Sequence, residues 1–227
     1  MTMVLNRENL DRISRRLREI GLPQTLMVDI VGEARKVDGD YFYVSHRMRV
    51  GNEPMEVSLG FQERDDGHFM PGLVGFSLPE SQRSLYLFPL SDLNVQEAYN
   101  MIQGRAVWRP AGLDSENDYW LRLEKDRSFH GLNMPVKVDS RLSVRKWLGE
   151  SPLAGVLGSE GKERIVADLQ AGDRVDLGHL MGKRAGMYFL EARPEKNGVE
   201  LRNGYGKALD IDEFARGHSP TLLKHRR

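Results

Sequence analysis

The segments YFYV at residues 41–44 and VSLGF at residues 57–61 begin the region of the sequence that decides the fold. Apolar and polar residues alternate in the second segment, as they do in a strand with one buried face. An Asp-Asp-Gly turn signal follows at 65–67, and further strands are expected near 69–78 and 85–90. Parallel pairing would need crossovers of a dozen residues or more. The sequence therefore predicts a four-stranded antiparallel meander.

Two helices are predicted before this region. Between residues 7 and 20 apolar side chains recur at helical spacing: Leu10, Ile13, Leu17 and Ile20. Gly21 and Pro23 end that pattern. A second, shorter helix is expected between residues 25 and 35.

After the meander, Asn94 followed by Glu97 has the pattern of a capping box, and Gly104 is well placed to end the helix that it starts. Further helices are expected at 142–148 and at 159–170. Strands are expected at 105–109, 119–124, 136–138, 174–181, 187–193 and 199–202, the last two joined by a turn at Asn197-Gly198.

Two segments of the chain resemble each other. Residues 98–123 and 167–190 each read as a helix, a glycine (Gly104 or Gly172), a strand, a loop and an aromatic strand. An internal duplication would explain the likeness. Glycine caps and aromatic strands are also common enough to recur without one.

These patterns together predict an α+β protein with mainly antiparallel sheets and about five helices in two subdomains. We expect an N-terminal subdomain at residues 1–130 and a C-terminal subdomain at 131–214. Residues 215–227 read as a basic flexible tail, because they are rich in Lys and Arg and lack periodicity.

The composition narrows the classes of function. The 33 basic and 33 acidic side chains cancel, which removes the compositional argument for a dedicated nucleic-acid-binding or membrane-surface protein. The chain has no cysteine, so disulfides, thiolate metal sites and cysteine nucleophiles are excluded. The chain begins without an apolar signal segment, and its densest apolar stretch, at 85–90, is too short to span a membrane. We expect a cytoplasmic protein that does not contact a membrane.

Familiar catalytic and cofactor-binding motifs do not fit. Residues 155–162 read GVLGSEGK, which resembles a phosphate-binding loop, but Glu163 stands where Ser or Thr is required. The serines lack a Gly-x-Ser-x-Gly setting, and the six histidines are scattered singly. The sequence therefore predicts no catalytic residue, no cofactor and no metal ligand.

Patterns typical of binding are somewhat clearer. The first predicted helix carries arginines opposite its apolar stripe, and three later segments mix tryptophan with basic residues. Arginine forks pair with phosphates, and aromatic strands can stack bases. Solvated helix faces and cross-strand pairs are the alternative explanation. The candidate nucleic-acid contacts are Arg12, Arg15, Arg16, Arg109, Trp120, Arg122, Arg145 and Lys146.

The order of several motifs resembles a family of uncharacterised proteins carried on bacterial conjugative transposons and related mobile elements. The motifs are NRENLD at 6–11, QEAYNMIQGRAV at 96–107, DLQAG at 168–172 and YFLEA at 188–192. The resemblance implies a cytoplasmic accessory protein, linked to DNA transfer or maintenance. It implies no catalytic residues.

Two hypotheses of different class follow. The first is a non-enzymatic binding or scaffolding module that contacts a protein partner or nucleic acid. The alternative is an enzyme of unrecognised type, with a site assembled from sequence-distant residues such as His46, His130 or Asp118. Converging polar groups in a deep pocket would favour the enzyme, and an exposed basic or apolar surface would favour the module.

Overall fold

The structure is a computed structural model, and it describes residues 5–36, 39, 41–63, 69–80, 83–87, 93–111, 117–129, 132–155, 157, 159–180 and 186–218. The backbone divides into two compact units. Unit 1 comprises residues 1–103 and 123–135, and unit 2 comprises residues 104–122 and 136–227.

The fold class is α+β with antiparallel sheets, as predicted. The division of the chain differs from the single boundary expected at residue 130, because residues 104–122 belong to unit 2. The reason lies in the core: Ala106 and Trp120 pack into the same buried cluster as the C-terminal half of the chain. That the two units are independent subdomains stays a prediction.

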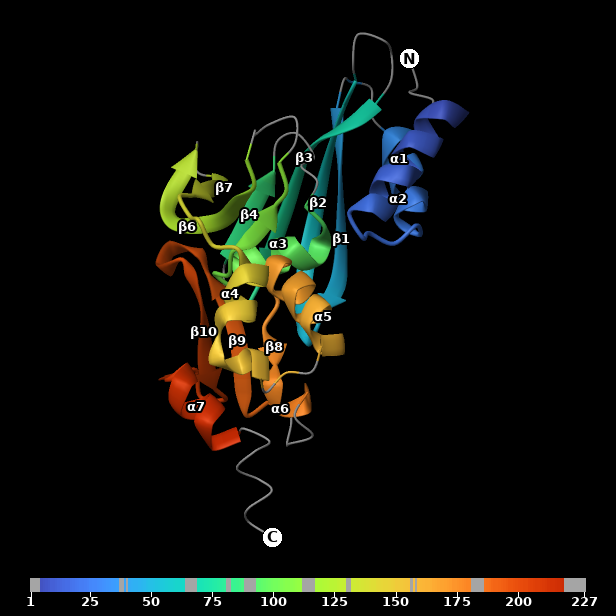
Figure 1. The fold of residues 1–227 in the computed structure, drawn as a ribbon. Helices are drawn as coiled ribbons and strands as arrows, with labels where there is room; N and C mark the ends of the chain where they lie inside the picture. Colours follow the sequence, from blue (N-terminus) through green and yellow to red (C-terminus); the bar gives the residue numbers. More distant parts are fainter. Residues whose placement is uncertain are drawn as a thin grey trace. The chain divides into compact units, whose positions relative to one another are not determined.

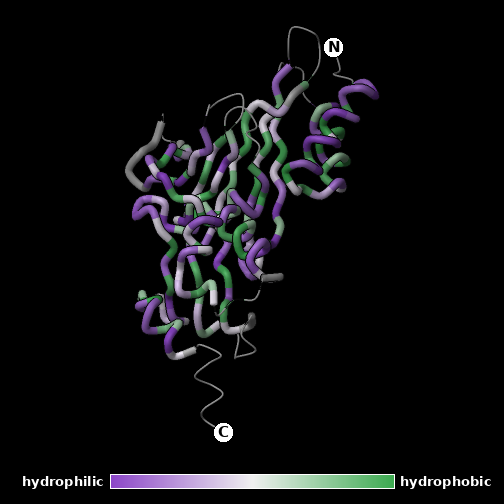
Figure 2. The backbone as a smooth tube through the Cα atoms, viewed as in Figure 1, coloured by the Kyte–Doolittle hydropathy of each residue, from purple (hydrophilic) through white to green (hydrophobic). Residues whose placement is uncertain are grey.

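Unit 1 contains the predicted meander (Figure 1). Its strands are paired antiparallel in the order β1 (Tyr41–Val50), β2 (Glu53–Glu63), β3 (Phe69–Leu78) and β4 (Arg83–Leu87). The register aligns one buried residue from each strand across the sheet: Val44, Leu59, Val74 and Leu87. Buried and exposed residues alternate along most of β1 and much of β2, whose hydropathy Figure 2 colours along the backbone, so one face of the sheet forms the core of unit 1.

Three helices pack against this sheet: α1 (Arg7–Glu19), α2 (Leu26–Ala34) and α3 (Val95–Ile102). Helix α2 contacts β1, α1 contacts β3, and α3 contacts both β3 and β4. Each helix buries an apolar stripe at the spacing that the sequence predicted, including Ile13, Leu17, Ile30 and Ala98. Burying these stripes supplies the main stabilisation of unit 1.

The capping box at the start of α3 is confirmed. The Asn94 side chain accepts from the Glu97 amide at 3.0 Å, and the Glu97 carboxylate accepts from the Asn94 amide at 2.9 Å. The Val95 amide also donates to the carbonyl of Ile20 at 2.8 Å, which joins α3 to the end of the first helix. The helix ends before Gly104, whose φ of +83° favours glycine.

Unit 2 is built around a second antiparallel sheet with the order β11-β10-β9-β8. A three-stranded sheet, β5-β6-β7, includes the strands in which the chain passes between the units. From residue 104 onward the described helices and strands are β5 (Val107–Arg109), β6 (Tyr119–Phe129), β7 (Leu132–Val138), α4 (Val144–Glu150), η1 (Pro152–Gly155), α5 (Ser159–Gln170), β8 (Val175–Asp176), α6 (Leu177–Leu180), β9 (Tyr188–Arg193), η2 (Pro194–Lys196), β10 (Gly198–Asn203), β11 (Ala208–Leu209) and α7 (Ile211–His218).

The structure corrects the sequence prediction at two places in unit 2. The strand expected at 174–181 has only two strand residues, and α6 follows at once. The flexible tail expected from residue 215 overlaps α7, in which Phe214 and Ala215 are buried. Helix α7 has only eight residues, so its apolar spacing is too short a pattern to recognise. Residues 219–227 lie outside the described part of the chain.

The likeness between residues 98–123 and 167–190 extends to the backbone. In both segments a helix ends at a glycine with positive φ, +83° at Gly104 and +81° at Gly172. A strand then pairs antiparallel with the strand that follows it, β5 with β6 and β8 with β9. The second segment also contains α6. A duplication as the origin of this likeness stays a prediction.

Replacing Asn94 by alanine is expected to lower the free energy of unfolding by about 1 kcal/mol, because the first turn of α3 loses its side-chain acceptor. Thr25→Ala is the matched control, since Thr25 precedes α2 without a capping hydrogen bond and should change stability by less than about 0.5 kcal/mol. Urea unfolding of the two variants measures the difference. Equal losses would show that the capping box does not stabilise unit 1.

Candidate binding pocket

The register of β9 and β10 determines which side chains meet on each face of this sheet. Leu190 faces Leu201 and Ala192 faces Val199, and all four belong to the core of unit 2. Because side chains alternate along a strand, Glu191 and Glu200 lie directly opposite each other on the other face. Two carboxylates in this position repel each other.

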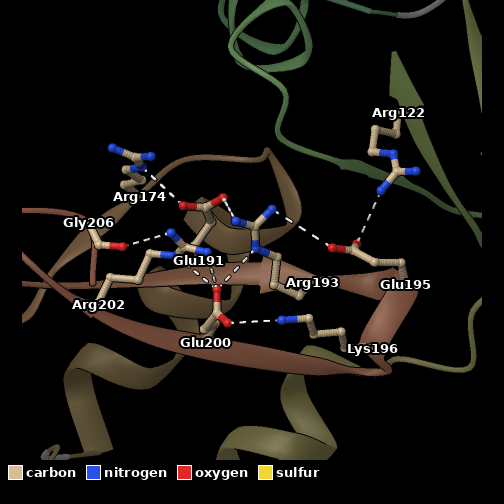
Figure 3. Close-up of polar contacts among 9 residues, drawn as sticks. All are labelled: Arg122, Arg174, Glu191, Arg193, Glu195, Lys196, Glu200, Arg202 and Gly206. Carbon is tan, nitrogen blue, oxygen red and sulfur yellow. Dashed lines mark hydrogen bonds and ion pairs between the residues drawn. The ribbon is translucent and has the colours of Figure 1, made fainter. Parts of the chain in front are cut away.

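Arg193 resolves that repulsion (Figure 3). Its guanidinium lies between the two acids, with Nη2 3.2 Å from Glu191 Oε1 and Nε 3.4 Å from Glu200 Oε2. Glu191 is only 5% exposed, so an unpaired charge there would be costly. Further cations lie on either side, with Arg174 bonded to Glu191, and both Lys196 and Arg202 bonded to Glu200.

These contacts set the acidity of Glu200. Desolvation raises its pKa, but hydrogen bonds and charge from Arg202 and Lys196 outweigh that effect, so the pKa lies below its ordinary value. At the far end of the network, Arg122 of β6 lies 3.7 Å from Glu195 of η2. Through Glu195 the network also links β6 to the hairpin of β9 and β10.

The Asn203 side chain stabilises the hairpin between β10 and β11. Asn203 Oδ1 accepts from the amide of Tyr205 at 3.0 Å and from the amide of Lys207 at 2.9 Å. Gly206, with φ at +80°, donates its amide to the Asn203 carbonyl at 2.8 Å. The side chain of Tyr205 is therefore presented on an ordered turn, and it is 99% exposed.

Backbone contacts bring this turn against the start of β9. The Gly204 amide donates to the Met187 carbonyl at 2.9 Å. A Cβ at position 204 would lie 2.5 Å from the carbonyl oxygen of Gly186, so glycine is required by this close approach. Gly186 itself donates its amide to the carboxylate of Asp176 at 2.6 Å.

Between this turn and α7 lies a cavity of about 840 Å³, which we call the Tyr205 pocket. Its lining includes the rings of Tyr188 and Phe214, which meet edge-on with centroids 4.9 Å apart and an interplanar angle of 65°. The lining residues are Gly186, Met187, Tyr188, Asn203, Gly204, Tyr205, Leu209, Asp210, Glu213 and Phe214.

Two carboxylates belong to the exposed rim of the Tyr205 pocket. Asp210 caps α7, because its Oδ1 accepts from the amide of Glu213 at 2.8 Å. Both side chains are exposed, and within the described residues neither forms an ion pair. The pocket therefore combines aromatic walls with negative charge.

The rim also exposes apolar surface. Among the described residues, the large hydrophobic side chains that lie in solvent are Val28, Tyr41, Tyr43, Met187 and Tyr205. The last two both line the Tyr205 pocket. Exposed apolar side chains around a concavity are typical of a binding site.

Three of the residues predicted to contact nucleic acid lie on α1 in unit 1. Arg12 is 2.9 Å from Glu8, and Arg16 is 2.8 Å from Glu19. Arg15 is exposed on the same helix. Two of the three arginines thus have an acidic partner on their own helix, as in the alternative explanation of a solvated face.

The other five predicted residues lie in unit 2. Trp120 is 1% exposed and donates its Nε1 to the Leu142 carbonyl at 3.2 Å, so its ring presents no face to a base. The remaining four all have protein partners: Arg109 with the Trp108 carbonyl, Arg122 with Glu195, Arg145 with Glu163, and Lys146 with Glu150.

The residues of the enzyme hypothesis fall in different units or outside the described residues. His46 lies on β1 in unit 1, Asp118 lies in unit 2, and His130 is outside the described residues. Asp118 lines a smaller cavity of about 430 Å³ with Trp108 and other residues of unit 2. Its carboxylate accepts from the Ala111 amide at 2.8 Å, which is a loop-stabilising contact.

Sequence reasoning missed a second exposed aromatic surface, on the outer face of the meander. Tyr41 and Tyr43 are more than half exposed and meet edge-on with centroids 5.2 Å apart. The Tyr43 ring lies over Gly60, where a Cβ would come within 2.9 Å of it. The alternation of β1 contained the signal, since Phe42 between the two tyrosines faces the core.

Comparison of the chain with known proteins gave no match to a family model, a curated protein or a solved structure. No helix in the described part of the chain combines the length and the apolar character of a membrane span. Within the same residues, no three His, Asp or Glu side chains are grouped so that they could hold a metal ion.

Replacing Arg193 by methionine is expected to lower the free energy of unfolding by about 2 kcal/mol or more, because Glu191 and Glu200 then face each other without the bridging cation. Arg174→Gln is the control, since Arg174 is half exposed and leaves the bridge intact; its effect should stay below about 1 kcal/mol. Chemical denaturation compares them. A loss no larger in the first variant would contradict the bridging role.

Acidification should destabilise the protein partly through Glu200. A carboxylate with a depressed folded pKa stabilises the fold above its unfolded value of 4.5 and loses this contribution as the pH falls through the folded pKa. Glu200→Gln should therefore be less stable than the wild type at neutral pH and show a smaller loss on acidification. Urea midpoints measured from neutral pH down to about pH 3 test this expectation. Parallel curves for the two proteins would contradict it.

Proposed function

We propose that this protein is a non-enzymatic binding module of the cytoplasm, and that unit 2 holds a short segment of a partner protein in the Tyr205 pocket. The observation that carries the proposal is the placement of Tyr205. A tyrosine 99% exposed, held by an ordered turn at the rim of a cavity of about 840 Å³, has no role in the core of unit 2. Its position suits contact with another molecule.

The residue types of the rim support a protein partner. Tyrosine and methionine are enriched at protein interfaces, and tyrosine contributes a large contact area with few rotatable bonds. The hydrogen bonds of Asn203 hold the Tyr205 turn before any partner arrives. Such preorganisation reduces the entropy lost on binding.

Charge favours a protein over a nucleic acid as the partner. The pocket carries Asp210 and Glu213, which would repel phosphate. Most of the arginines and lysines predicted to contact nucleic acid are engaged by acidic side chains. Nucleic-acid binding would contradict this proposal.

The size of the cavity limits what it can hold. A volume of about 840 Å³ lies within the range of sites that enclose a small ligand, roughly 300–1,000 Å³. A short extended segment with several of its side chains would fit in it. The resemblance to mobile-element proteins adds the proposal that the partner belongs to such an element, which rests on motif order alone.

Peptides selected for binding to the full chain from a displayed random library should include a group that depends on the pocket. For this group, Tyr205→Ser is expected to weaken binding by about tenfold or more, because the variant removes the largest exposed aromatic contact at the rim of the pocket. Fluorescence anisotropy of labelled peptides measures the affinity. Tyr41→Ser is the control, since Tyr41 is an exposed tyrosine of unit 1.

Tyr205→Ser should keep the unfolding midpoint of the wild type, because this side chain lies in solvent. Tyr41→Ser loses its edge-on contact with Tyr43 and should cost no more than about 1 kcal/mol. The proposal would be refuted if no selected peptide depended on Tyr205. Anisotropy with labelled single-stranded DNA, duplex DNA and RNA, at about 50 and about 200 mM salt, tests the other partner class. Salt-sensitive binding that Arg12, Arg15 and Arg16 require would replace the proposed partner by nucleic acid.

A further inference from the structure

We infer that the partner places a cationic side chain, arginine or lysine, in the Tyr205 pocket. The inference rests on the proposed function and names the chemistry of the group that enters. The described lining residues include two acids, Asp210 and Glu213, and no Lys, Arg or His. They also include three aromatic rings, of Tyr188, Tyr205 and Phe214.

The aromatic walls suit the stem and the head of such a side chain. Lysine and arginine carry an apolar stem below the charge, and this stem packs on apolar surface while the charge stays near water. The faces of aromatic rings attract cations, most strongly where solvent is partly excluded. The edge-on packing of Tyr188 and Phe214 fixes two of these rings relative to each other.

The carboxylates supply the charge complement. Glu213 is exposed and forms no ion pair within the described structure, and Asp210 uses one oxygen to accept from a backbone amide. An ionised carboxylate has about four acceptor positions, so this bond leaves room for a cation. A guanidinium or ammonium group at the rim would pair with both acids without displacing an existing partner.

The apolar residues of the rim favour a protein side chain over a small free cation as the occupant of the pocket. Met187 and Tyr205 expose apolar surface beside the carboxylates, and a free cation would leave that surface in water. A peptide covers it with the residues on either side of its cation. The occupant is therefore an arginine or lysine flanked by apolar residues.

The test titrates the isotope-labelled full chain with acetyl-arginine amide and follows backbone amide shifts by NMR. We expect shifts at Met187, Tyr188, Tyr205 and Glu213. Acetyl-citrulline amide has nearly the same shape without the charge. Its affinity for the protein should be lower by about fivefold or more. Acetyl-norleucine amide, which keeps only the stem, should bind more weakly than the arginine compound as well.

Matched variants on α7 locate the charge. Glu213→Gln should weaken binding of acetyl-arginine amide by about threefold or more and leave the citrulline compound unchanged. Asp212→Asn is the control, because Asp212 is an exposed acid of the same helix that does not line the pocket. Asp210→Asn keeps a capping acceptor and should act like Glu213→Gln.

Absence of shifts at the pocket amides with acetyl-arginine amide would overturn the inference. Equal affinity for the arginine, citrulline and norleucine compounds would overturn it too. An equal effect of Asp212→Asn and Glu213→Gln would assign the attraction to the general field of α7 and refute the site. The peptides that depend on Tyr205 test the proposed function separately. If such a peptide places a neutral side chain in the pocket, only the inference of a cationic side chain is refuted.

Discussion

Unit 2 depends on the register of β9 against β10. The core requires Leu190, Ala192, Val199 and Leu201 on one face, and this requirement leaves Glu191 opposite Glu200 on the other. A one-residue slip would exchange the two faces. The arrangement is stable because Arg193 lies between the acids, with further cations beside each of them (Figure 3).

The same register positions the Tyr205 pocket. The ladder ends where Asn203 pairs with Tyr188, and the chain turns there under the hydrogen bonds of the Asn203 side chain. Tyr188 therefore lies beside the turn that exposes Tyr205, and the buried Phe214 packs against its ring. Phe214 thus belongs to both the site and the core of unit 2, and Tyr188 packs against that core. A preformed surface of this kind suits recognition of a short segment.

The sequence predicts most of unit 1 because the patterns there are long. Strand β1 alternates over ten residues, and the apolar stripe of α1 extends over about three turns. The capping box at Asn94 and Glu97 is a local signal that needs no distant contact. By the same alternation, the outward position of Tyr41 and Tyr43 could have been read from β1.

The candidate site could not be predicted, because its determinants are short or distant. Helix α7 spans only about two turns, and its second half lies in the segment from residue 215 that reads as a basic tail. Trp120 looked like a stacking residue, but its burial depends on packing with residues far along the chain. The pairing of Arg145 with Glu163 joins positions 18 residues apart. Such partners decide whether a basic residue is free, and spacing alone does not reveal them.

The central claim is that the Tyr205 pocket receives a cationic side chain between its rings and the acids of α7. Intermolecular NOEs from acetyl-arginine amide test it most directly. The account predicts contacts from the ligand's side-chain methylenes to the ring protons of Tyr188 and Phe214. NOEs to the rings of Tyr41 and Tyr43 instead, or none to any ring of unit 2 at saturation, would contradict it.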